Sequence, residues 1–547
     1  MAVEKNPNKE KSKDNIINLD LEKENRSENV NFELDPETGE LEVEFSDDAN
    51  IEDEEEEEGT FYENLADSLE EDDLEDIANT VIEKYDADKS SRAEWESMFE
   101  RGFDLLGLKL EDTTEPFEGA ATAVHPLLIE SAVKFQSKAS GELFPSKGPV
   151  KVQILGNVTE SKQKQGNRVQ NFLNYQVSEQ MPEFFDETER MLFHLPLLGS
   201  AFKKIYYDDS LERPVSEFVP IDQFYVSYYA TDLRRADRYT HILYRSPIEL
   251  ARQINAGMYR DIDLPDPELP RQSVMAEKMD TVLGLSPSSE SDPQYTLLEQ
   301  HCYLELEDYD TACPYIVTVE EQSQKVLSIR RNWNEKDRTK QKKMFFTHYR
   351  FVPGFGFYGL GLIHFLGNLT MSATAAMRSL IDAGQFANLQ GGFKAKGVKV
   401  VGDNDPIAPG EFKEVEATGM DLNKSIIMFP YKEPSQTLYN MMQYVAGAGQ
   451  KFADTTEQII SEGANYGPVG TTMALLEASS KFFSAIHKRL HKAQREEFKI
   501  LARIDSESLP NRYPYDVPGE SSEIFKLDFD DKIDIIPVSD PNIPSSA

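Results

Sequence analysis

Three glycines in the stretch Pro353–Leu366, PGFGFYGLGLIHFL, have the spacing of a nucleotide-binding turn. Gly354, Gly356 and Gly359 form a G-x-G-x-x-G pattern that follows a β-like run and precedes a helix-like run. In dinucleotide-binding enzymes this pattern lets the backbone approach a pyrophosphate at the N-terminus of a helix. The pattern therefore raises the question of a cofactor enzyme.

The surroundings of these glycines argue against that interpretation, and we predict no cofactor. The predicted helix alone takes up about 30 residues, the length of a complete strand–helix–strand unit in cofactor-binding proteins. The nearest acidic residue for a ribose, Asp382, lies inside this helix and not at the end of a following strand. Phe355, Phe357 and Tyr358 lie between the glycines and would crowd a pyrophosphate. We predict a structural elbow between a strand and a long helix, with glycine dihedrals closed to β-branched residues.

Other patterns for catalysis or metal binding are equally weak. The sequence contains no G-x-x-x-x-G-K-[ST], H-E-x-x-H or G-x-S-x-G. Cys302 and Cys313 lack metal-ligand spacing with the histidines, and two thiols do not make a disulfide scaffold, which favours a reducing compartment. His125 stands alone, and a packing role is favoured over a catalytic one. Carboxylates could hold Mg²⁺ in a nuclease, but nothing spaces them as a site. We therefore expect no enzyme activity and no metal.

The charge of the chain is strongly negative and unevenly distributed. Residues 1–80 contain 30 acidic and 6 basic residues, which is more than half of the net charge of −41. We predict a disordered acidic tail over residues 1–72, because runs such as Ser46–Thr60 have almost nothing to bury. Docking or DNA mimicry is an alternative to a merely solvated tail. The sequence shows neither a signal peptide nor an apolar run of 18 residues, so no membrane span is expected.

The remaining chain alternates between helical and β-rich segments, which predicts an α+β fold. Helical periodicity begins near Leu74, with core positions expected at Ile77, Val81, Ile82, Trp95 and Phe99. Short strands with a period of two follow from about residue 199 to residue 352. A long helix, a β-rich insert (391–430), a second helix (435–463), a glycine-rich break (463–470) and a third helix to residue 504 complete the order.

The first two of these long helices are rich in Ala, Ser and Thr, with scattered Leu, Met and Ile. Such helices suit close packing against copies of themselves in a ring, although packing inside a single-domain bundle is the alternative. The chain resembles the portal proteins of tailed bacteriophages, most closely those of podovirus-like phages, over about residues 75–547. The resemblance rests on the order of four stretches: PFEGAATAVHPLLIESAVKFQSKASGELFP, SEFVPIDQFYVSYYATDLRRADRYTHI, PGFGFYGLG and NYGPVGTTMALLEA.

The resemblance implies a division of the chain into the parts of a portal subunit. These parts are a wing (73–359, β-rich from about 199), a first stem helix (360–390), a β-rich clip (391–433), a second stem helix (434–462), a tunnel loop (463–472), a long wing helix (473–503), and wing strands with the C-terminal end (504–547). From the same resemblance, we expect the helical crown of that family to be absent or truncated in this chain.

The resemblance also implies a structural function in the virion. It implies a homo-oligomeric ring of about twelve subunits at one capsid vertex, through which double-stranded DNA is packaged and ejected. The implied partners are the major capsid protein, the terminase large subunit, the scaffolding protein and head-tail adaptor or tail proteins, with assembly in the host cytoplasm. An acidic conduit fits this function, because each phosphate that Lys or Arg neutralises adds affinity and would slow the DNA.

Two groups of residues are candidates for DNA contact. The resemblance places Asn465, Tyr466, Gly467, Pro468 and Val469 in the loop that faces DNA. The candidate basic contacts are Lys394, Lys396 and Lys399, and a second basic cluster (488–495) is more simply explained as balanced surface charge. The alternatives to a portal are a metal-dependent nuclease, a nucleotide-binding packaging component, or an adaptor that acts through its acidic tail.

Overall fold

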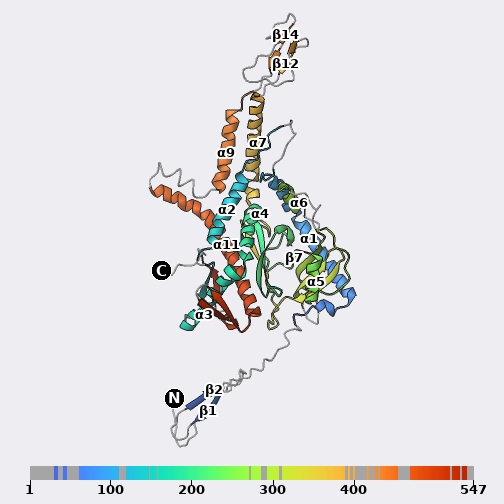
Figure 1. Ribbon diagram of the computed structural model, residues 1–547, viewed down its shortest axis with the longest axis vertical. Coiled ribbons are helices and arrows are strands. Elements are labelled where there is room, and N and C mark those ends of the chain that lie inside the picture. Colours follow the sequence, from blue (N-terminus) through green and yellow to red (C-terminus); the bar gives the residue numbers. More distant parts are fainter. Residues whose placement is uncertain are drawn as a thin grey trace, which may run out of the picture. The chain divides into compact units, whose positions relative to one another are not determined.

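The protein is described by a computed structural model of the 547-residue chain, which forms two compact units, Met1–Thr60 and Phe61–Ala547. The described residues are 30–34, 41–45, 61–109, 117, 119–146, 148–156, 158–269, 273–284, 292–306, 311–388, 392–394, 398–400, 415–417, 426–428, 432–453, 469–517, 520–529 and 533–538. The mixture of helices and sheets confirms the α+β class (Figure 1).

The acidic N-terminal region contains more structure than its composition predicts. In the first unit, β1 (Val30–Leu34) pairs antiparallel with β2 (Leu41–Phe45). In the second unit, the side chain of Ala66 is fully buried, and Phe61 and Leu65 pack against the same apolar cluster. The predicted tail of residues 1–72 is therefore wrong in its boundary, because a few apolar side chains among the acidic ones are enough to attach residues 61–70 to the fold.

The second unit begins with α1 (Glu71–Asp104), whose first turn is acidic, as suits the positive end of a helix dipole. Val81, Trp95 and Phe99 are buried as predicted, while Ile77 and Ile82 are partly buried. The helices that follow are α2 (Leu127–Leu143), α3 (Glu160–Tyr175), the π-helical η2 (Gln176–Gln180), α4 (Glu183–Leu198), α5 (Pro247–Asn255) and α6 (Val274–Val282).

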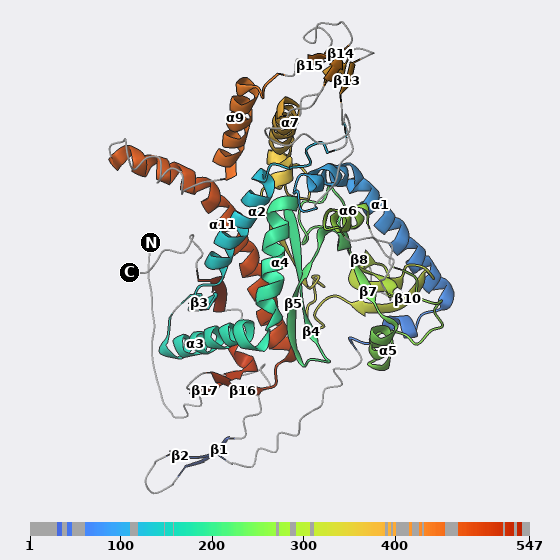
Figure 2. The same ribbon diagram turned by 45° about the horizontal axis from the view of Figure 1, so that its top comes forward.

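The predicted β-rich segment forms two antiparallel sheets. The first has the order β10-β9-β8-β7-β6 and the second the order β11-β4-β5. The strands of the first are β6 (Phe224–Tyr225), β7 (Tyr239–Arg245), β8 (Tyr295–Leu304), β9 (Cys313–Glu320) and β10 (Lys325–Arg331), and those of the second are β4 (Ser200–Asp208), β5 (Arg213–Val219) and β11 (Phe346–Arg350). Helix α4 packs on β4 and β5 (Figure 2).

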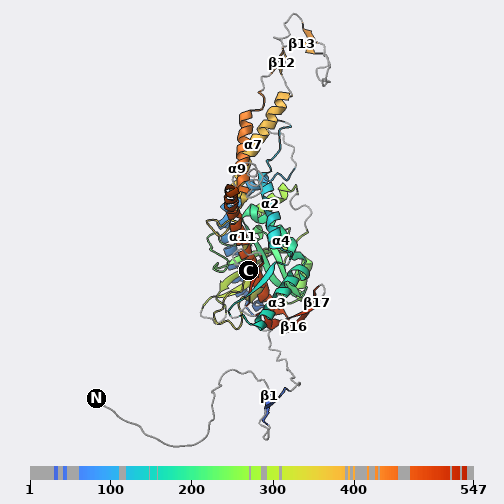
Figure 3. The same ribbon diagram turned by 90° about the vertical axis from the view of Figure 1, so that its left-hand side faces the viewer.

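Two long helices and a small β insert follow the second sheet. Helices α7 (Leu362–Asn388) and α9 (Gln436–Ala453) lie side by side (Figures 1 and 3). They run in opposite directions, because Gly384 near the end of α7 lies against Pro434, just before α9. Between them, β12 (Gly392–Lys394) pairs with β15 (Ile426–Met428), and β13 (Val398–Val400) pairs with β14 (Val415–Ala417).

The last long helix is α11 (Val469–Ser508), and its residues from Ile486 to Ile504 contribute to the two largest apolar clusters. The largest apolar cluster lies where α2, α4, α7 and α11 meet β4, β5 and β11. A buried ion pair joins β4 to α11, since Lys203 Nζ lies 2.7 Å from Glu497 Oε1. The remaining strands are β3 (Val150–Ile154), which pairs with β18 (Ile533–Pro537), and β16 (Arg512–Val517), which pairs with β17 (Glu520–Phe525).

Within the ranges given above, none of the helices combines the length and the apolar composition that a membrane span requires. Helix α7 illustrates why. It has 27 residues, but polar residues such as Asn368, Ser372 and Arg378 recur along it.

Candidate functional site

The elbow of the G-x-G-x-x-G pattern joins β11 to α7, as predicted from the sequence. Its backbone is held on several sides. Phe357 N donates to Tyr228 O at 2.8 Å, and Leu360 N donates to Val352 O at 2.7 Å. Gly359 N donates to the hydroxyl of Ser200 at 2.8 Å. The strand therefore turns into the helix through a segment with a defined backbone path.

The glycines of the elbow are required by close packing. A Cβ on Gly354 would lie 2.6 Å from the carbonyl oxygen of Tyr358, and one on Gly356 would lie 2.6 Å from the ring of Tyr228. A Cβ on Gly359 would lie 2.9 Å from Val352 O and would overlap the carbonyl oxygen of Gly199.

None of the three has a φ between +20° and +160°, so our expectation of special dihedrals at these positions is wrong. Gly199, whose carbonyl oxygen lies against Gly359, does have a left-handed φ, at +86°. The space beside the α-carbon of each glycine is therefore filled by the protein's own backbone or by the ring of Tyr228.

Two of the elbow aromatics anchor it in the core. Tyr358 is 1% exposed, its hydroxyl donates to Val226 O at 3.0 Å, and its ring stacks on Trp95 with the centroids 4.7 Å apart. Arg92, also fully buried, donates to the Tyr358 hydroxyl at 3.1 Å and to Phe224 O at 2.7 Å. Burial raises the pKa of Tyr358, which keeps its hydroxyl neutral and able to donate.

The rest of the chain covers the distal halves of the paired helices α7 and α9 only in part. Ala376 is the last buried residue of α7, and none of the residues from 377 to 388 is buried. Among residues 436–450 of α9, only Ala446 and Gly449 are buried. The exposed large apolar side chains of these halves include Ile381 (40%), Tyr439 (42%), Met441 (54%) and Tyr444 (78%). The ring of Phe386 packs against that of Phe117, with the centroids 4.6 Å apart.

These helices are also nearly free of charge. Apart from histidine, α7 contains only Arg378 and Asp382 as charged residues, and α9 contains only Lys451, whereas 28% of the whole chain is charged. The guanidinium of Arg378 donates to Thr122 O (2.8 Å) and Ala123 O (2.9 Å). Asp382 accepts a hydrogen bond from Ala121 N at 2.8 Å. Both charges thus attach α7 to residues 121–123, and the exposed face of the pair is apolar or neutral.

Of the five residues predicted for the DNA-facing loop, the structure describes one, Val469. Asn465, Tyr466, Gly467 and Pro468 lie outside the described residues. Val469 is the first residue of α11, so its prediction as a loop residue is wrong, since the third helix begins earlier than residue 473.

Of the three candidate basic residues of the insert, the structure describes Lys394 and Lys399. Lys394 ends β12, where it pairs with Ile426 of β15. Lys399 lies in the middle of β13, and Lys396 lies outside the described residues. Lys394 and Lys399 therefore belong to different two-stranded sheets of the insert.

The second basic cluster is used in part for packing. Lys488 and Lys492 are exposed, whereas Arg489 and Arg495 contact neighbouring elements. Arg489 Nε donates to Phe351 O at 3.0 Å, which ties α11 to the residue that follows β11. Arg495 pairs with Asp534, and Lys499 Nζ lies 3.2 Å from the same carboxylate. Arg495 and Lys499 thus hold α11 against β18.

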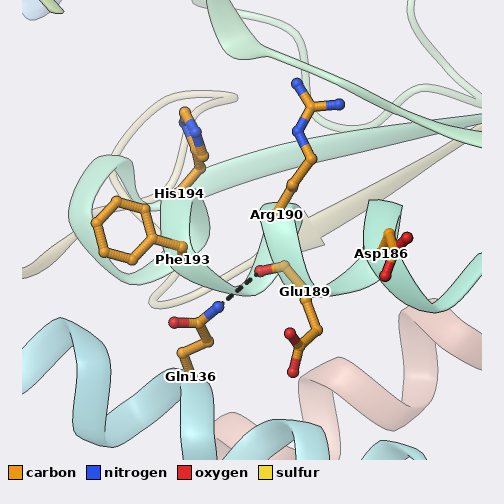
Figure 4. A pocket seen from close by; sticks show the side chains of 6 residues that line it. All are labelled: Gln136, Asp186, Glu189, Arg190, Phe193 and His194. Atoms are coloured by element: carbon orange, nitrogen blue, oxygen red, sulfur yellow. Dashed lines mark hydrogen bonds between the residues drawn. The ribbon is translucent and has the colours of Figure 1, made fainter.

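Sequence reasoning missed a hollow of about 380 Å³ between α2 and α4 (Figure 4). It is lined by Gln136, Asp186, Glu189, Arg190, Phe193 and His194. Gln136 Nε2 donates to Glu189 O at 3.1 Å, and burial lowers the pKa of His194 to about 4, so this imidazole is neutral at pH 7. In the part of the chain that the structure describes, no three His, Cys, Asp or Glu side chains are arranged to hold a metal ion.

Comparison with known protein families finds no match for this chain. Comparison with curated protein sequences finds none either.

Proposed function

We propose that this chain is the subunit of a portal ring, which forms the channel for double-stranded DNA at one vertex of a phage capsid. In this proposal α7 and α9 line the channel, and the β insert (391–433) docks the terminase and later the tail proteins. The wing, built from the two sheets and α1, contacts the capsid and scaffolding proteins. The protein acts by position and shape, without catalysis.

The observation that carries this proposal is the uncovered apolar face of the distal halves of α7 and α9. An exposed apolar stripe on paired helices needs a partner, because soluble proteins rarely leave contiguous apolar surface in water. Repetition of the same pair around an axis would cover it with copies of itself. The low charge of the pair has a second advantage, because neutral walls do not bind phosphates with the salt-dependent strength of Lys and Arg.

The first experiment measures the assembly of the purified chain by mass photometry and negative-stain microscopy. We expect rings of about twelve copies. Tyr444→Glu places a charge on the uncovered face and should reduce assembly, while Leu527→Glu, at a residue that is 88% exposed outside this pair, should not. A parent protein that remains monomeric at all concentrations would refute the ring, and magnesium-dependent cleavage of DNA by that monomer would favour the nuclease.

The second experiment tests the DNA-facing role that sequence resemblance implies for Asn465 and Tyr466. Replacing both with Lys should leave rings intact and should slow DNA packaging or ejection, most strongly at low salt, where phosphate contacts are strongest. Intact rings with unchanged packaging and ejection would show that these residues do not meet the DNA.

A further inference from the structure

The paired strands of the first unit, β1 and β2, form an antiparallel hairpin with one apolar face and one acidic face (Figure 1). Successive residues of a strand belong to opposite faces, and residues paired across two antiparallel strands share a face. The other face carries Asn31 opposite Glu44 and Glu33 opposite Glu42. The apolar face holds every apolar residue of both strands, in the pairs Val30–Phe45, Phe32–Val43 and Leu34–Leu41.

A hairpin of this kind needs a second layer to be stable. Two strands alone are marginally stable in water. The like charges of Glu33 and Glu42, which lie directly opposite each other, weaken the pairing further. Within residues 30–34 and 41–45, the described part of the first unit, the hairpin is a single layer. Its apolar face therefore stabilises the hairpin only where another apolar surface covers it.

The same face on a second copy of the chain fits this requirement in shape. The copies are related by half a turn about an axis that is parallel to the strands and lies between the two layers. Each cross-strand pair then lies over the same pair of the other copy, with the strands exchanged. A phenylalanine meets a valine at two levels of the contact, and leucine meets leucine at the third. Large residues facing small ones let two layers interdigitate without voids.

We infer that the hairpin of β1 and β2 packs face to face with the hairpin of a second copy, forming a small two-layered β-sandwich. The contact is isologous, because both copies use the same face. The layers of such sandwiches lie about 10 Å apart, so both acidic faces remain outside, in water. Edge-to-edge pairing of two hairpins would extend the sheet but would leave the apolar faces in water. The inference concerns the first unit alone and does not depend on the proposed ring.

The test measures how fast a single introduced thiol in the full chain reacts with a maleimide. The native cysteines, Cys302 and Cys313, are 4% and 2% exposed, so they contribute only a slow background. Val43→Cys reports on the apolar face, and Glu42→Cys is the matched control on the acidic face. Each rate is divided by that of the same variant unfolded in urea. The Val43→Cys thiol should then react about tenfold more slowly than the Glu42→Cys thiol.

Co-expression with a chain that lacks residues 1–60 identifies what covers the apolar face. A large excess of the shortened chain separates the hairpins from one another, so the protection of the Val43→Cys thiol should be lost. Phe32→Ser, at the paired position of the same face, should also abolish the protection, whereas Asn31→Ser on the acidic face should preserve it. Higher salt should strengthen the protection, because salt screens the repulsion between the two acidic faces.

Three results would overturn the inference. Equal rates for the two thiols would show that the apolar face is not covered. Protection that persists in an excess of the shortened chain would show that the cover is not a second hairpin. Protection that weakens with salt would point to a basic partner surface. Rings that form normally in any of these cases would leave the proposed ring intact.

Discussion

The closest backbone contact of the elbow makes Gly359→Ala a decisive substitution. The added methyl carbon would lie 2.9 Å from Val352 O and would overlap the carbonyl oxygen of Gly199. Carbon–oxygen contacts ordinarily lie at about 3.3 Å or more. Both neighbours are backbone atoms, so no side chain can rotate away, and the strand end or the elbow itself has to move.

The cost follows from the bonds that such a movement would weaken. Gly359 N to Ser200 Oγ (2.8 Å), Leu360 N to Val352 O (2.7 Å) and Phe351 N to Gly199 O (3.0 Å) all cross this contact. Each contributes about 1 kcal/mol net, and overpacking costs about 1–3 kcal/mol. We therefore expect Gly359→Ala to lower the unfolding free energy by about 3–5 kcal/mol, a large part of the about 5–15 kcal/mol that stabilises a typical domain.

The assay is urea unfolding followed by circular dichroism, with parent and variants at the same subunit concentration because assembly raises apparent stability. Gly141→Ala in α2 is the matched control, since no atom lies within 4 Å of the added methyl group. Replacing an exposed helical glycine should be neutral or stabilising by about 0.5–1 kcal/mol. Equal midpoints for Gly359→Ala and the parent would refute the assignment of these glycines to close packing.

Three further predictions concern the interior and the N-terminus. Glu497→Ala would leave the buried ammonium group of Lys203 without its carboxylate partner, so the unfolding free energy measured by chemical denaturation should fall by about 3–5 kcal/mol. The double variant Lys203→Met/Glu497→Leu should recover most of this loss. An unchanged unfolding free energy for Glu497→Ala would contradict the prediction. Burial raises the pKa of Asp505 to about 7, so the folded state holds a proton that the unfolded chain releases near pH 4, and the unfolding free energy should fall as pH rises from about 4 to about 7. Asp505→Asn should flatten that dependence in melting curves, and an unchanged slope would count against it. Deleting residues 1–60 should preserve the melting temperature of the body, whereas deleting 1–70 should lower it because Phe61, Leu65 and Ala66 pack in the core; equal melting temperatures would disprove that attachment.

Local periodicity explains which parts of the fold could be predicted from the sequence. The buried positions Val81, Trp95 and Phe99 repeat along one face of α1, and the alternating strands of both sheets carry the same kind of local signal. The elbow was located for a similar reason, because glycine spacing between a strand and a helix is visible in a short window.

Long-range contacts explain what could not be predicted. The carbonyl of Gly199 and the ring of Tyr228, which require glycine in the elbow, lie far from it in sequence. Arg92 meets Tyr358 across 266 positions, and composition alone would place that arginine on the surface. The exposure of Phe355 could not be predicted, because Phe355, Phe357 and Tyr358 look alike in the sequence, and only the packed structure separates the exposed ring from the buried ones.

The attachment of α7 has a mechanical consequence. The root of the helix is fixed by the elbow, its shaft is buried as far as Ala376, and Arg378 and Asp382 brace it against residues 121–123. Beyond this last attachment, the stretch from Asp382 to Asn388 extends about 9 Å at 1.5 Å per residue. A force applied at the insert is therefore expected to bend α7 beyond Asp382. In an isolated subunit the tip would yield while the sheets stay in place. In the proposed ring, contacts with adjacent subunits would stiffen the tip.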